Sequence, residues 1–498
     1  MEAMNLLVIV SDQHNPSIFG AAGHDVVRTP NLDTLARSGS LFSAAYCASP
    51  LCVPARAALA TGQYVHRIGA WDNASPYTGT PPSWGHLAGA AGVAVTTVGK
   101  LHYRSSVDDT GFPDQHLAMH VKDGVGAVRS LVRDRRARSD RMLKVLAAAG
   151  PGESEYTAYD RTLGAEARRW LAETGVRLSR PWVLVVGFVA PHFPWTAPQC
   201  FYDLYSEEDI ELPVNGPEGL HPVLSELRVI KGLDAVIPEN TVLRARRAYF
   251  GLVSFLDAQV GEILGALADL GLAERTRIVY TSDHGEMLGE HGLWGKSVMY
   301  EGSVRVPLIL SGPDQPNEVV RDRPVSHLDL FRTILEGVGV RVASADGPGR
   351  SLWDGGESDR QTGRPMSWRE ERPVLSEYHG GGSPVGMFML RQGRWKLIHY
   401  VGAAPQLFDV DQDPSETEDL SQGAQAADTL RHLQRSLRAL VNPEEVDARA
   451  RRDQADRLSE RGGASAVLGG EQFFHTPAPS AEADTAPLDR RVTGGGVW

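Results

Sequence analysis

The chain has 498 residues, of which 42% are hydrophobic and 22% are charged, a composition typical of a globular protein with more than one domain. Its formal net charge of −12 argues against nucleic acid as a partner, so any anionic substrate would need a locally positive pocket. Three cysteines, Cys47, Cys52 and Cys200, do not suggest a disulfide framework and fit a reducing compartment, so we expect a cytoplasmic protein.

Short apolar runs alternate with helical patterns through the first two thirds of the chain. Continuous apolar runs of this length are typical of strands buried on both faces of a mostly parallel sheet. The first run is too short for a signal peptide or a membrane span, and no other stretch looks suited to cross a bilayer, so we expect no membrane partner. The runs lie at 6–10, 93–98, 182–189, 278–280 and 306–310.

Helices are predicted between these runs, so the fold class is α/β. The segment 31–38 follows Pro30 and precedes a glycine, and 241–270 places its apolar residues on one face before Gly271. A shorter helix is predicted from Pro54 to about Gly62, because proline is favoured in a first turn and glycine after a last one.

The pattern changes after about residue 355. Strand-like pieces at 374–378, 387–390, 395–399 and 406–409 precede a helical segment at 426–440, which indicates a small antiparallel α+β unit. We therefore predict a catalytic α/β domain over 1–370, a C-terminal α+β subdomain over 371–442, and a helix with an extended tail over 443–498.

Two segments outside the predicted core carry open alternatives. The Arg-rich segment 129–144 is either an anion or nucleic-acid patch or a solvated helix or subunit contact, and we favour the second interpretation. The tail carries Phe473, Phe474 and His475 in an otherwise weakly patterned end, so it is either a frayed terminus or a docking segment.

Polar residues stand directly after four of the predicted strands. In open α/β sheets, ligands bind beyond the carboxyl ends of the strands, so side chains at those positions converge. We therefore expect one site built from residues that are far apart in the chain. These residues are Asp12, Gln13 and His14 after the first strand, Lys100 and His102 after the second, His192 after the third, and Asp283 and His284 after the fourth.

Cys52 lies just before the predicted helix that opens near Pro54. Unpaired backbone N–H groups at a helix N-terminus favour an anion, and Arg56 adds a full positive charge one turn later. A cysteine in this position is a candidate thiolate nucleophile. The alternative is a small buried hydrophobic residue, which is the usual role of a free cysteine.

The sequence around Cys52 resembles the type I sulfatase family of the alkaline phosphatase superfamily. Cys52-Val53-Pro54-Ala55-Arg56 matches its C-x-P-x-R signature, and Thr61-Gly62 matches the extended form. The opening VIVSDQ at 8–13, the GKLH at 99–102 and the TSDHGE at 281–286 also resemble that family, in the same order. The resemblance covers most of residues 5–420, and the sequence resembles choline-sulfatase-like members most.

This resemblance implies a fold, an activity and a cofactor. The fold is a large, mostly parallel or mixed sheet sandwiched by helices, with a small C-terminal subdomain. The activity is hydrolysis of sulfate monoesters by the hydrate of a formylglycine, which a formylglycine-generating enzyme makes from Cys52. Choline-sulfatase-like enzymes also use their C-terminal tails in subunit contacts, so we expect a homo-oligomer.

The family pattern assigns a metal site and a positive pocket. Asp12, Gln13, Asp283, His284 and the formylglycine at 52 would hold one divalent cation. Oxygen donors suit Ca²⁺, Mg²⁺ or Mn²⁺, and Ca²⁺ is the ion most often used in the family. His14 is expected to orient its neighbours and not to bind metal.

The resemblance also gives roles to the residues of the positive pocket. His192 and Lys296 would stabilise charge and protonate the leaving alcohol, while His102, helped by Lys100, would act as the base that releases sulfate. The assignment of acid and base between the two histidines is an inference. The complete set of pocket residues is Arg56, Lys100, His102, His192 and Lys296.

Two other interpretations stay open at the level of the sequence. A phosphonate monoester hydrolase or phosphodiesterase of the same superfamily shares the formylglycine and the metal, but such enzymes tend to lack the Lys and His of GKLH. An inactive scaffold protein predicts loss of the acid–base or metal residues, and none is missing. Residues 103–109 depart from the choline sulfatase pattern, and Glu377 is interpreted either as a contact for a cationic leaving group or as an exposed strand carboxylate.

Overall fold

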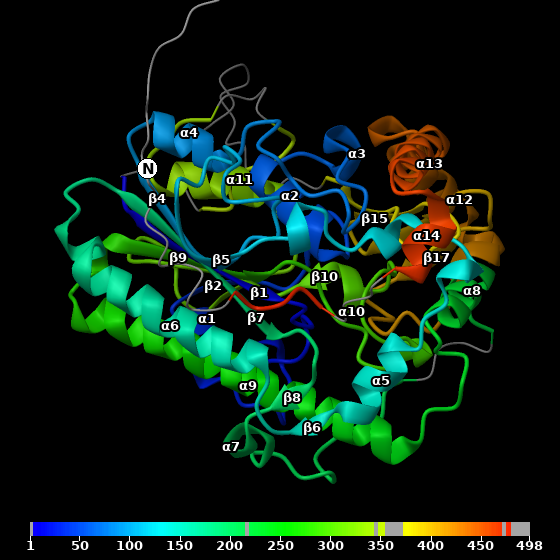
Figure 1. The fold of residues 1–498 in the computed structure, drawn as a ribbon, viewed down its shortest axis with the longest axis horizontal. Coiled ribbons are helices and arrows are strands. Elements are labelled where there is room, and N and C mark those ends of the chain that lie inside the picture. The colour runs from blue at the N-terminus through cyan, green and yellow to red at the C-terminus, as the bar shows by residue number, and fades with distance from the viewer. Residues whose placement is uncertain (1–2, 215–218, 343–346, 354–371, 471–474, 480–498) are drawn as a thin grey trace, which may run out of the picture.

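The apolar runs of the first two thirds of the chain form the centre of one large sheet. The computed structural model describes residues 3–214, 219–342, 347–353, 372–470 and 475–479 (Figure 1). The sheet has eight strands in the order β12-β2-β11-β9-β1-β7-β4-β5. The four central strands match the predicted runs and extend them by a few residues. They are β1 (Asn5–Asp12), β4 (Ala94–Lys100), β7 (Trp182–Pro191) and β9 (Thr276–Ser282).

The centre of the sheet is parallel and one side of it is mixed. β1 pairs in parallel with β7 and β9, and β4 pairs in parallel with β7 and β5 (Asp114–Met119). β11 (Leu308–Ser311) runs antiparallel to β9 and to β2 (Gly39–Phe42), and β12 (Val319–Arg321) closes that side. Four neighbouring strands therefore end at the same edge of the sheet.

The predicted strand at 306–310 was wrong as a single element. The chain forms β10 (Arg305–Val306), which pairs with β3 (Ala45–Tyr46), and then joins the main sheet as β11. Pro307 lies between the two strands, and proline has no N–H to donate to a ladder.

Helices cover both faces of the sheet (Figure 1). One layer contains α6 and α9, which pack on β7, and α1, which packs on α9. The other contains α4 and α11, which pack on β4 and β1, and α2, which packs on both of these helices. The predicted helices at 31–38, 54–62 and 241–270 are thus present as α1, α2 and α9. The bounds are α1 Pro30–Arg37, α2 Cys52–Thr61, α4 Trp84–Ala90, α6 Glu155–Glu173, α9 Glu239–Asp269 and α11 His327–Gly337.

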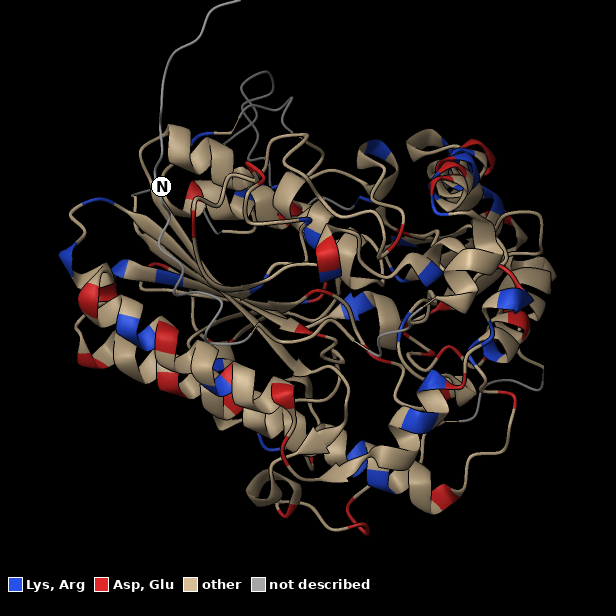
Figure 2. Ribbon diagram, viewed as in Figure 1, with Lys and Arg blue, Asp and Glu red and all other residues tan. Residues whose placement is uncertain are grey.

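The helix α9 corrects the view that no stretch could cross a bilayer. By length and composition it passes that test, with a mean hydropathy of 1.4 over its most apolar window. However, 61% of that window is buried within the protein, against α6, α7 (Gln199–Tyr202) and the sheet. Charged residues line the outer side of α6 and α9, where Arg168 and Glu262 form a 2.6 Å ion pair between the two helices (Figure 2). The packing is that of a core helix.

A separate four-stranded antiparallel sheet lies near the C-terminus, at the predicted runs. Its order is β14-β15-β16-β17, and α12 (Ala427–Leu440) packs on β15 and β16. This confirms the fold class of an α/β sheet domain with a small α+β unit, while the domain boundaries stay predictions. The strands are β14 Val374–Tyr378, β15 Met387–Gln392, β16 Trp395–Tyr400 and β17 Gln406–Asp409.

The charged helix predicted after residue 442 is α13 (Pro443–Glu460), followed by α14 (Gly463–Gly469). α13 returns to the catalytic part of the chain, because the Trp71 indole donates to Asp453 at 2.7 Å and Gln454 donates to Asp72 at 2.8 Å. Phe473 and Phe474 of the tail lie outside the described residues, but 475–479 are described.

We favoured a solvated helix or a subunit contact for the Arg-rich segment 129–144, and the helix is not formed as one element, while the subunit contact stays a prediction. The segment forms two 3₁₀ turns, Val128–Leu131 and Arg135–Ala137, and then enters α5 (Arg141–Ala148). The side chain of Arg133 is buried between the turns, where it donates to Asp447 at 2.8 Å and to the carbonyl of Ser383 at 3.1 Å. A buried arginine of this kind prevents the segment from lying as one helix on the surface.

Candidate active site

The predicted site residues meet beyond the carboxyl ends of the four central strands. Asp12 is the last residue of β1, Lys100 is the last residue of β4, and His192 directly follows β7. Asp283 and His284 directly follow β9. All five side chains are buried. The strand-end pattern therefore brings chain-distant polar groups into one place.

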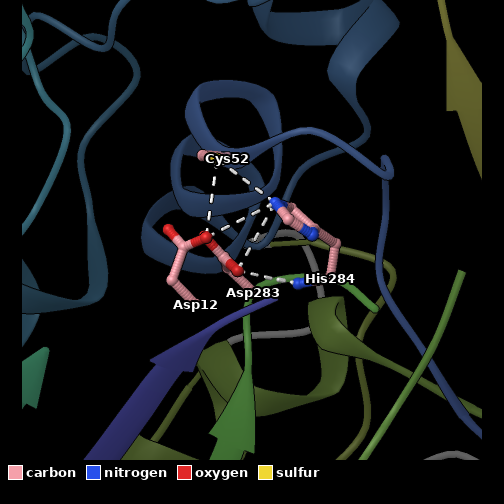
Figure 3. Close-up of side chains that lie close together, drawn as sticks. All are labelled: Asp12, Cys52, Asp283 and His284. Carbon is pink, nitrogen blue, oxygen red and sulfur yellow. Dashed lines mark hydrogen bonds and ion pairs between the residues drawn. The ribbon is translucent and has the colours of Figure 1, made fainter. Parts of the chain in front are cut away.

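Figure 3 shows the centre of the site, which consists of Asp12, Cys52, Asp283 and His284. One ligand atom from each of these four buried residues lies within 4.8 Å of the other three. The His284 Nε2 atom is 3.9 Å from Asp12 Oδ1, 3.6 Å from Asp283 Oδ1 and 3.2 Å from Cys52 Sγ. The two carboxylate distances are too long for hydrogen bonds.

Two cations hold the far oxygens of these carboxylates. Lys100 Nζ lies 2.6 Å from Asp12 Oδ2, and Arg56 Nε donates to Asp283 Oδ2 at 2.8 Å. Arg56 also donates to the carbonyl of Lys100 at 2.7 Å. Burial alone would raise the pKa of Asp12, but Lys100 and the other surrounding cations hold it well below its usual value. Arg56 is therefore a positioning residue, because its guanidinium is directed at the carboxylates.

The donor set fits a divalent cation. With both Oδ2 atoms engaged, Oδ1 of Asp12 and Oδ1 of Asp283 face the imidazole of His284, whose Nδ1 donates to the carbonyl of Gly285 at 3.0 Å. That hydrogen bond leaves Nε2 of a neutral ring free as a ligand. Two anionic oxygens and one imidazole nitrogen are donors that Ca²⁺, Mg²⁺ and Mn²⁺ accept.

Cys52 is the first residue of α2, at the helix end that carries unpaired N–H groups. Its sulfur accepts a hydrogen bond from Lys296 Nζ at 3.3 Å. Burial and Asp12 would raise the pKa of the thiol, but Lys296, His284 and Lys100 outweigh them and lower it. The sulfur occupies the position where an oxygen of formylglycine would stand if the residue were converted.

Gln13 is held in an uncommon backbone conformation, with φ at +68°. Its Oε1 accepts from Lys296 Nζ at 2.5 Å, and its Nε2 donates to Glu286. The metal-ligand role of Gln13 thus stays a prediction, since its amide oxygen is engaged by Lys296. The sequence analysis missed Glu286, although it stands only three residues after Asp283 in the same motif.

His192 is a further buried residue of the site. Its Nδ1 is 2.5 Å from the carbonyl of Phe193, so the N–H of that nitrogen donates there and Nε2 remains free. Burial and then Lys296 lower the pKa of His192 well below its usual value, which favours the neutral imidazole.

His102 also has a left-handed backbone, with φ at +55°. Burial, followed by Lys100 and Arg56, lowers its pKa well below the usual value. Its Nε2 lies 3.1 Å from the hydroxyl of Thr476, which comes from the C-terminal tail. Tyr156 of α6 fixes that segment by donating to the carbonyl of Thr476 at 2.6 Å. No pattern in the sequence indicated that Thr476 or Tyr156 would lie at the site.

Two further sequence interpretations are decided by hydrogen bonds. Both ring nitrogens of His14 are engaged, at 2.7 Å from the Tyr280 hydroxyl and 3.0 Å from the carbonyl of Ile18, so His14 orients its neighbours as predicted. The interpretation of Glu377 was wrong in both forms. Its carboxylate is fully buried and bonded to His66 and His379, so it is neither exposed nor free to meet a leaving group.

Comparison with known proteins finds related sequences over nearly the whole chain. The sulfatase family matches residues 4–340, and the family described as N-sulphoglucosamine sulphohydrolase, C-terminal, matches residues 289–443. The choline-sulfatase of Rhizobium meliloti (strain 1021) is 32% identical over 471 residues, which cover 91% of this chain and 90% of that protein.

Solved structures share the fold at lower identity. The phosphonate monoester hydrolase of Agrobacterium radiobacter has a TM-score of 0.67 and 22% identity, covering 90% of this chain and 96% of that one. A structure in complex with its substrate D-glucosamine-2-N,6-O-disulfate has a TM-score of 0.71 and 20% identity, covering 91% and 99%. These likenesses establish the alkaline phosphatase-like fold.

Proposed function

The chain belongs to the sulfatase family and hydrolyses sulfate monoesters, and we propose that its nucleophile is a formylglycine made from Cys52. The observation that carries this proposal is the surroundings of the Cys52 side chain. Lys296 Nζ is 3.3 Å from its sulfur, His284 Nε2 is 3.2 Å away and Asp12 Oδ1 is 3.8 Å away. The hydrate of formylglycine supplies a hydroxyl group as the nucleophile at this position.

A single divalent cation completes the site in this proposal. Asp12, Asp283 and His284 would hold it, together with Gln13 and the formylglycine. Ca²⁺ is the ion we propose, with Mn²⁺ or Mg²⁺ as alternatives, because the donors are mainly oxygens. When bound, the cation supplies positive charge that offsets negative charge on the reacting oxygens.

The side chains of the pocket bind the sulfate and move the protons. Lys296 and Lys100 supply positive charge next to position 52, where the anionic sulfate must lie. We assign His192, with Lys296, to protonation of the leaving alcohol oxygen. A bound sulfate would raise the pKa of His192, because its negative charge offsets that of Lys296. His102 is neutral and is assigned as the base that takes the proton when sulfate is released.

Maturation and assembly belong to the same proposal. A formylglycine-generating enzyme would act on Cys52 before the chain folds around it, since the side chain is buried. Cys47, Cys52 and Cys200 are free thiols, which supports a cytoplasmic location. A homo-oligomer is proposed because the tail of the chain carries an aromatic cluster directly before residues that dock at the site.

Two measurements test this function. Peptide mass spectrometry of protein made beside a formylglycine-generating enzyme should find an aldehyde or its hydrate at residue 52, and unmodified cysteine would contradict the proposal. A kinetic panel of aryl sulfate, alkyl sulfate, choline sulfate, phosphodiester and phosphonate monoester should give the highest kcat/KM for a sulfate. A higher value for the phosphonate or the phosphodiester would favour the alternative activity of the superfamily.

A further inference from the structure

The six arginines of segment 129–144 differ in what they contact, and one of them stands apart. Five have an acidic or carbonyl partner for the guanidinium, although Arg129 Nε and Arg133 Nη1 are also buried without a partner among the described residues. Arg133 contacts Asp447 at 2.8 Å, Arg135 contacts Glu226, Arg136 contacts Asp134 at 2.6 Å, Arg138 contacts Asp234 at 3.0 Å, and Arg129 donates to the carbonyl of Arg138 at 2.7 Å.

The sixth, Arg141, has no acid or carbonyl partner for its side chain among the described residues. Its guanidinium lies over the ring of Phe193, 4.8 Å from the ring centroid. Its Nε atom is buried and has no hydrogen-bond partner. The residue as a whole is partly exposed, so its guanidinium is partly buried, without an anion from the described residues, and within reach of one that arrives from solvent.

Arg141 lies on the Cys52 side of the molecule. Phe193 directly follows His192, and the amine of Lys296 lies 5.7 Å from the centroid of the same ring. Lys296 in turn donates to the Cys52 sulfur. Burial lowers the pKa of Arg141 to about 10, and the electrostatic influence of Tyr156 and Cys52 opposes that shift only in part. Arg141 and Lys296 therefore lie against the same aromatic ring, and Lys296 connects that ring to position 52.

A second cation accompanies Arg141. Lys231 Nζ donates to the carbonyl of Lys296 at 2.5 Å. Burial, with smaller contributions from Lys296 and Arg141, lowers the pKa of Lys231 to about 7, and Glu286 opposes that shift, so an added anion would favour its charged form. The cleaved sulfate monoester carries a single negative charge, and Lys296 and Lys100 are already positioned next to it. Arg141 and Lys231 are positive charge beyond what that sulfate requires.

We propose that Arg141, with Lys231 beside it, binds an anionic group on the alcohol part of the substrate. The preferred substrate is then a sulfate ester that also carries a carboxylate or a second sulfate. A guanidinium that stacks on an aromatic face keeps its in-plane N–H groups free for two parallel bonds to such an oxyanion. This inference rests on the proposed function, because it describes the leaving group of the same reaction.

The test uses alkyl sulfates of three to six carbons whose far end is a methyl group, a carboxylate or a second sulfate. The group at the far end has little effect on the reactivity of the leaving oxygen. Differences in kcat/KM between the series therefore report how the enzyme recognises that group. The natural chain should prefer both anionic series over the methyl series, and choline sulfate should be poor because its quaternary ammonium meets two cations. The carboxylate and sulfate series show separately which oxyanion the site prefers.

Substitutions assign the preference to Arg141. Arg141→Met should reduce the ratio of anionic to neutral kcat/KM by roughly tenfold to a hundredfold, the range expected for hydrogen bonds between charged groups. Arg141→Lys should restore part of the ratio. Arg136→Met is the matched control, because Arg136 lies in the same segment but pairs with Asp134 on the surface, and it should leave both rates unchanged.

Three outcomes overturn the inference. The first is a natural chain that hydrolyses neutral and anionic esters equally well, which also decides the matter if Arg141→Met fails to fold. The second is an Arg141→Met chain in which both rates are unchanged, which makes the cation structural. Equal losses on both series would instead assign Arg141 to the cleaved sulfate itself. If no sulfate ester is hydrolysed at all, the proposed function fails and not this inference.

Discussion

Two clusters of buried carboxylates and histidines, one around Glu377 and one around Asp12 and Asp283, have similar composition and different roles. Around Glu377, Oε1 accepts from the backbone N–H of His66 at 3.0 Å and lies 2.9 Å from its ring, while Oε2 lies 3.1 Å from His379. Around Asp12 and Asp283, cations engage Oδ2 of each carboxylate, and the Oδ1 atoms face the imidazole of His284. Oδ1 of Asp283 also accepts from the backbone N–H groups of His284 at 2.9 Å and Gln13 at 3.2 Å. The first cluster binds its carboxylate through histidines within hydrogen-bond range, whereas the second holds two carboxylates around an imidazole that neither of them bonds directly.

This difference separates a structural cluster from a functional one. Both contain histidine beside carboxylate, and both are inaccessible to bulk water. In the Glu377 cluster each histidine–carboxylate contact is within hydrogen-bond range, so both carboxylate oxygens are satisfied. In the catalytic cluster the carboxylate–imidazole distances of 3.6 and 3.9 Å suit a shared cation better than a direct bond. Arrangement, and not residue type, therefore identifies the site.

The largest effect is expected from Cys52→Ala. Removing the side chain that carries the nucleophile should lower kcat/KM by roughly 10⁴-fold or more, as for other enzymes that lose their nucleophile. The melting temperature should change little, because the substitution removes a single small atom. Activity assays and thermal unfolding on the same preparation make the measurement, and residual turnover within tenfold of the natural chain would exclude Cys52 as the nucleophile.

Asp12→Asn and Asp283→Asn should each lower metal content and activity together. Each removes one anionic ligand from a hard cation, and we expect losses of roughly a hundredfold or more in kcat/KM. Elemental analysis beside kinetics tests the coupling. Glu377→Gln is the matched control, since it neutralises a buried carboxylate outside the site and should keep both metal and turnover per folded molecule. Full activity after exhaustive chelation would rule out the metal assignment.

The Glu377 cluster should reveal itself through stability and pH. Burial alone would raise the pKa of Glu377, but His66 and His379 lower it to about 2. A carboxyl with a depressed pKa stabilises the fold above its usual pKa, and the contribution is lost as pH falls from about 4.5 towards 2. Glu377→Gln should lower the free energy of unfolding at neutral pH by on the order of 3 kcal/mol. It should also weaken the dependence of that free energy on pH below about pH 4.5.

Denaturant unfolding of the natural chain and Glu377→Gln between pH 2 and pH 7 measures this effect. The two curves should converge at low pH, because the carboxyl of the natural chain is then protonated as well. A constant difference across the whole range would show that packing, and not ionisation, accounts for the loss.

The smallest effect is expected at the tail. Thr476→Val removes the hydroxyl that lies 3.1 Å from His102 Nε2, so kcat/KM should change by a few-fold, the equivalent of about 1 kcal/mol. Truncation after Gly470 removes the whole docking segment and tests assembly by light scattering. Loss of oligomer mass would support a tail that holds subunits together, and retained mass with a raised KM would limit its role to the pocket.

Local signals in the sequence predicted most of the fold. Continuous apolar runs placed β1, β4, β7 and β9, and the alternation with helices gave the layered architecture, because period and length are properties of neighbouring residues. The split between β10 and β11 was missed, although Pro307 was visible, since β10 pairs with β3, which lies more than two hundred residues away, while β11 joins β9 and β2 of the main sheet.

The strand-end residues of the site also came from the sequence, because each stands at or directly after the end of a strand that the sheet aligns with the others, whereas the roles of Cys52, Arg56 and Lys296 came from the family resemblance. What tertiary structure decided was the partner of each charge. Arg56 meets Asp283 across 227 positions, and Glu377 meets His66 across 311, so nothing local could predict which carboxylate would be satisfied. Arg141 looked like its neighbours in an Arg-rich run and became distinct only when folding gave the other five partners and left it facing Phe193. The pairing of buried charges depends on which distant segments of the chain come into contact. The periodicity and spacing of neighbouring residues do not predict those contacts.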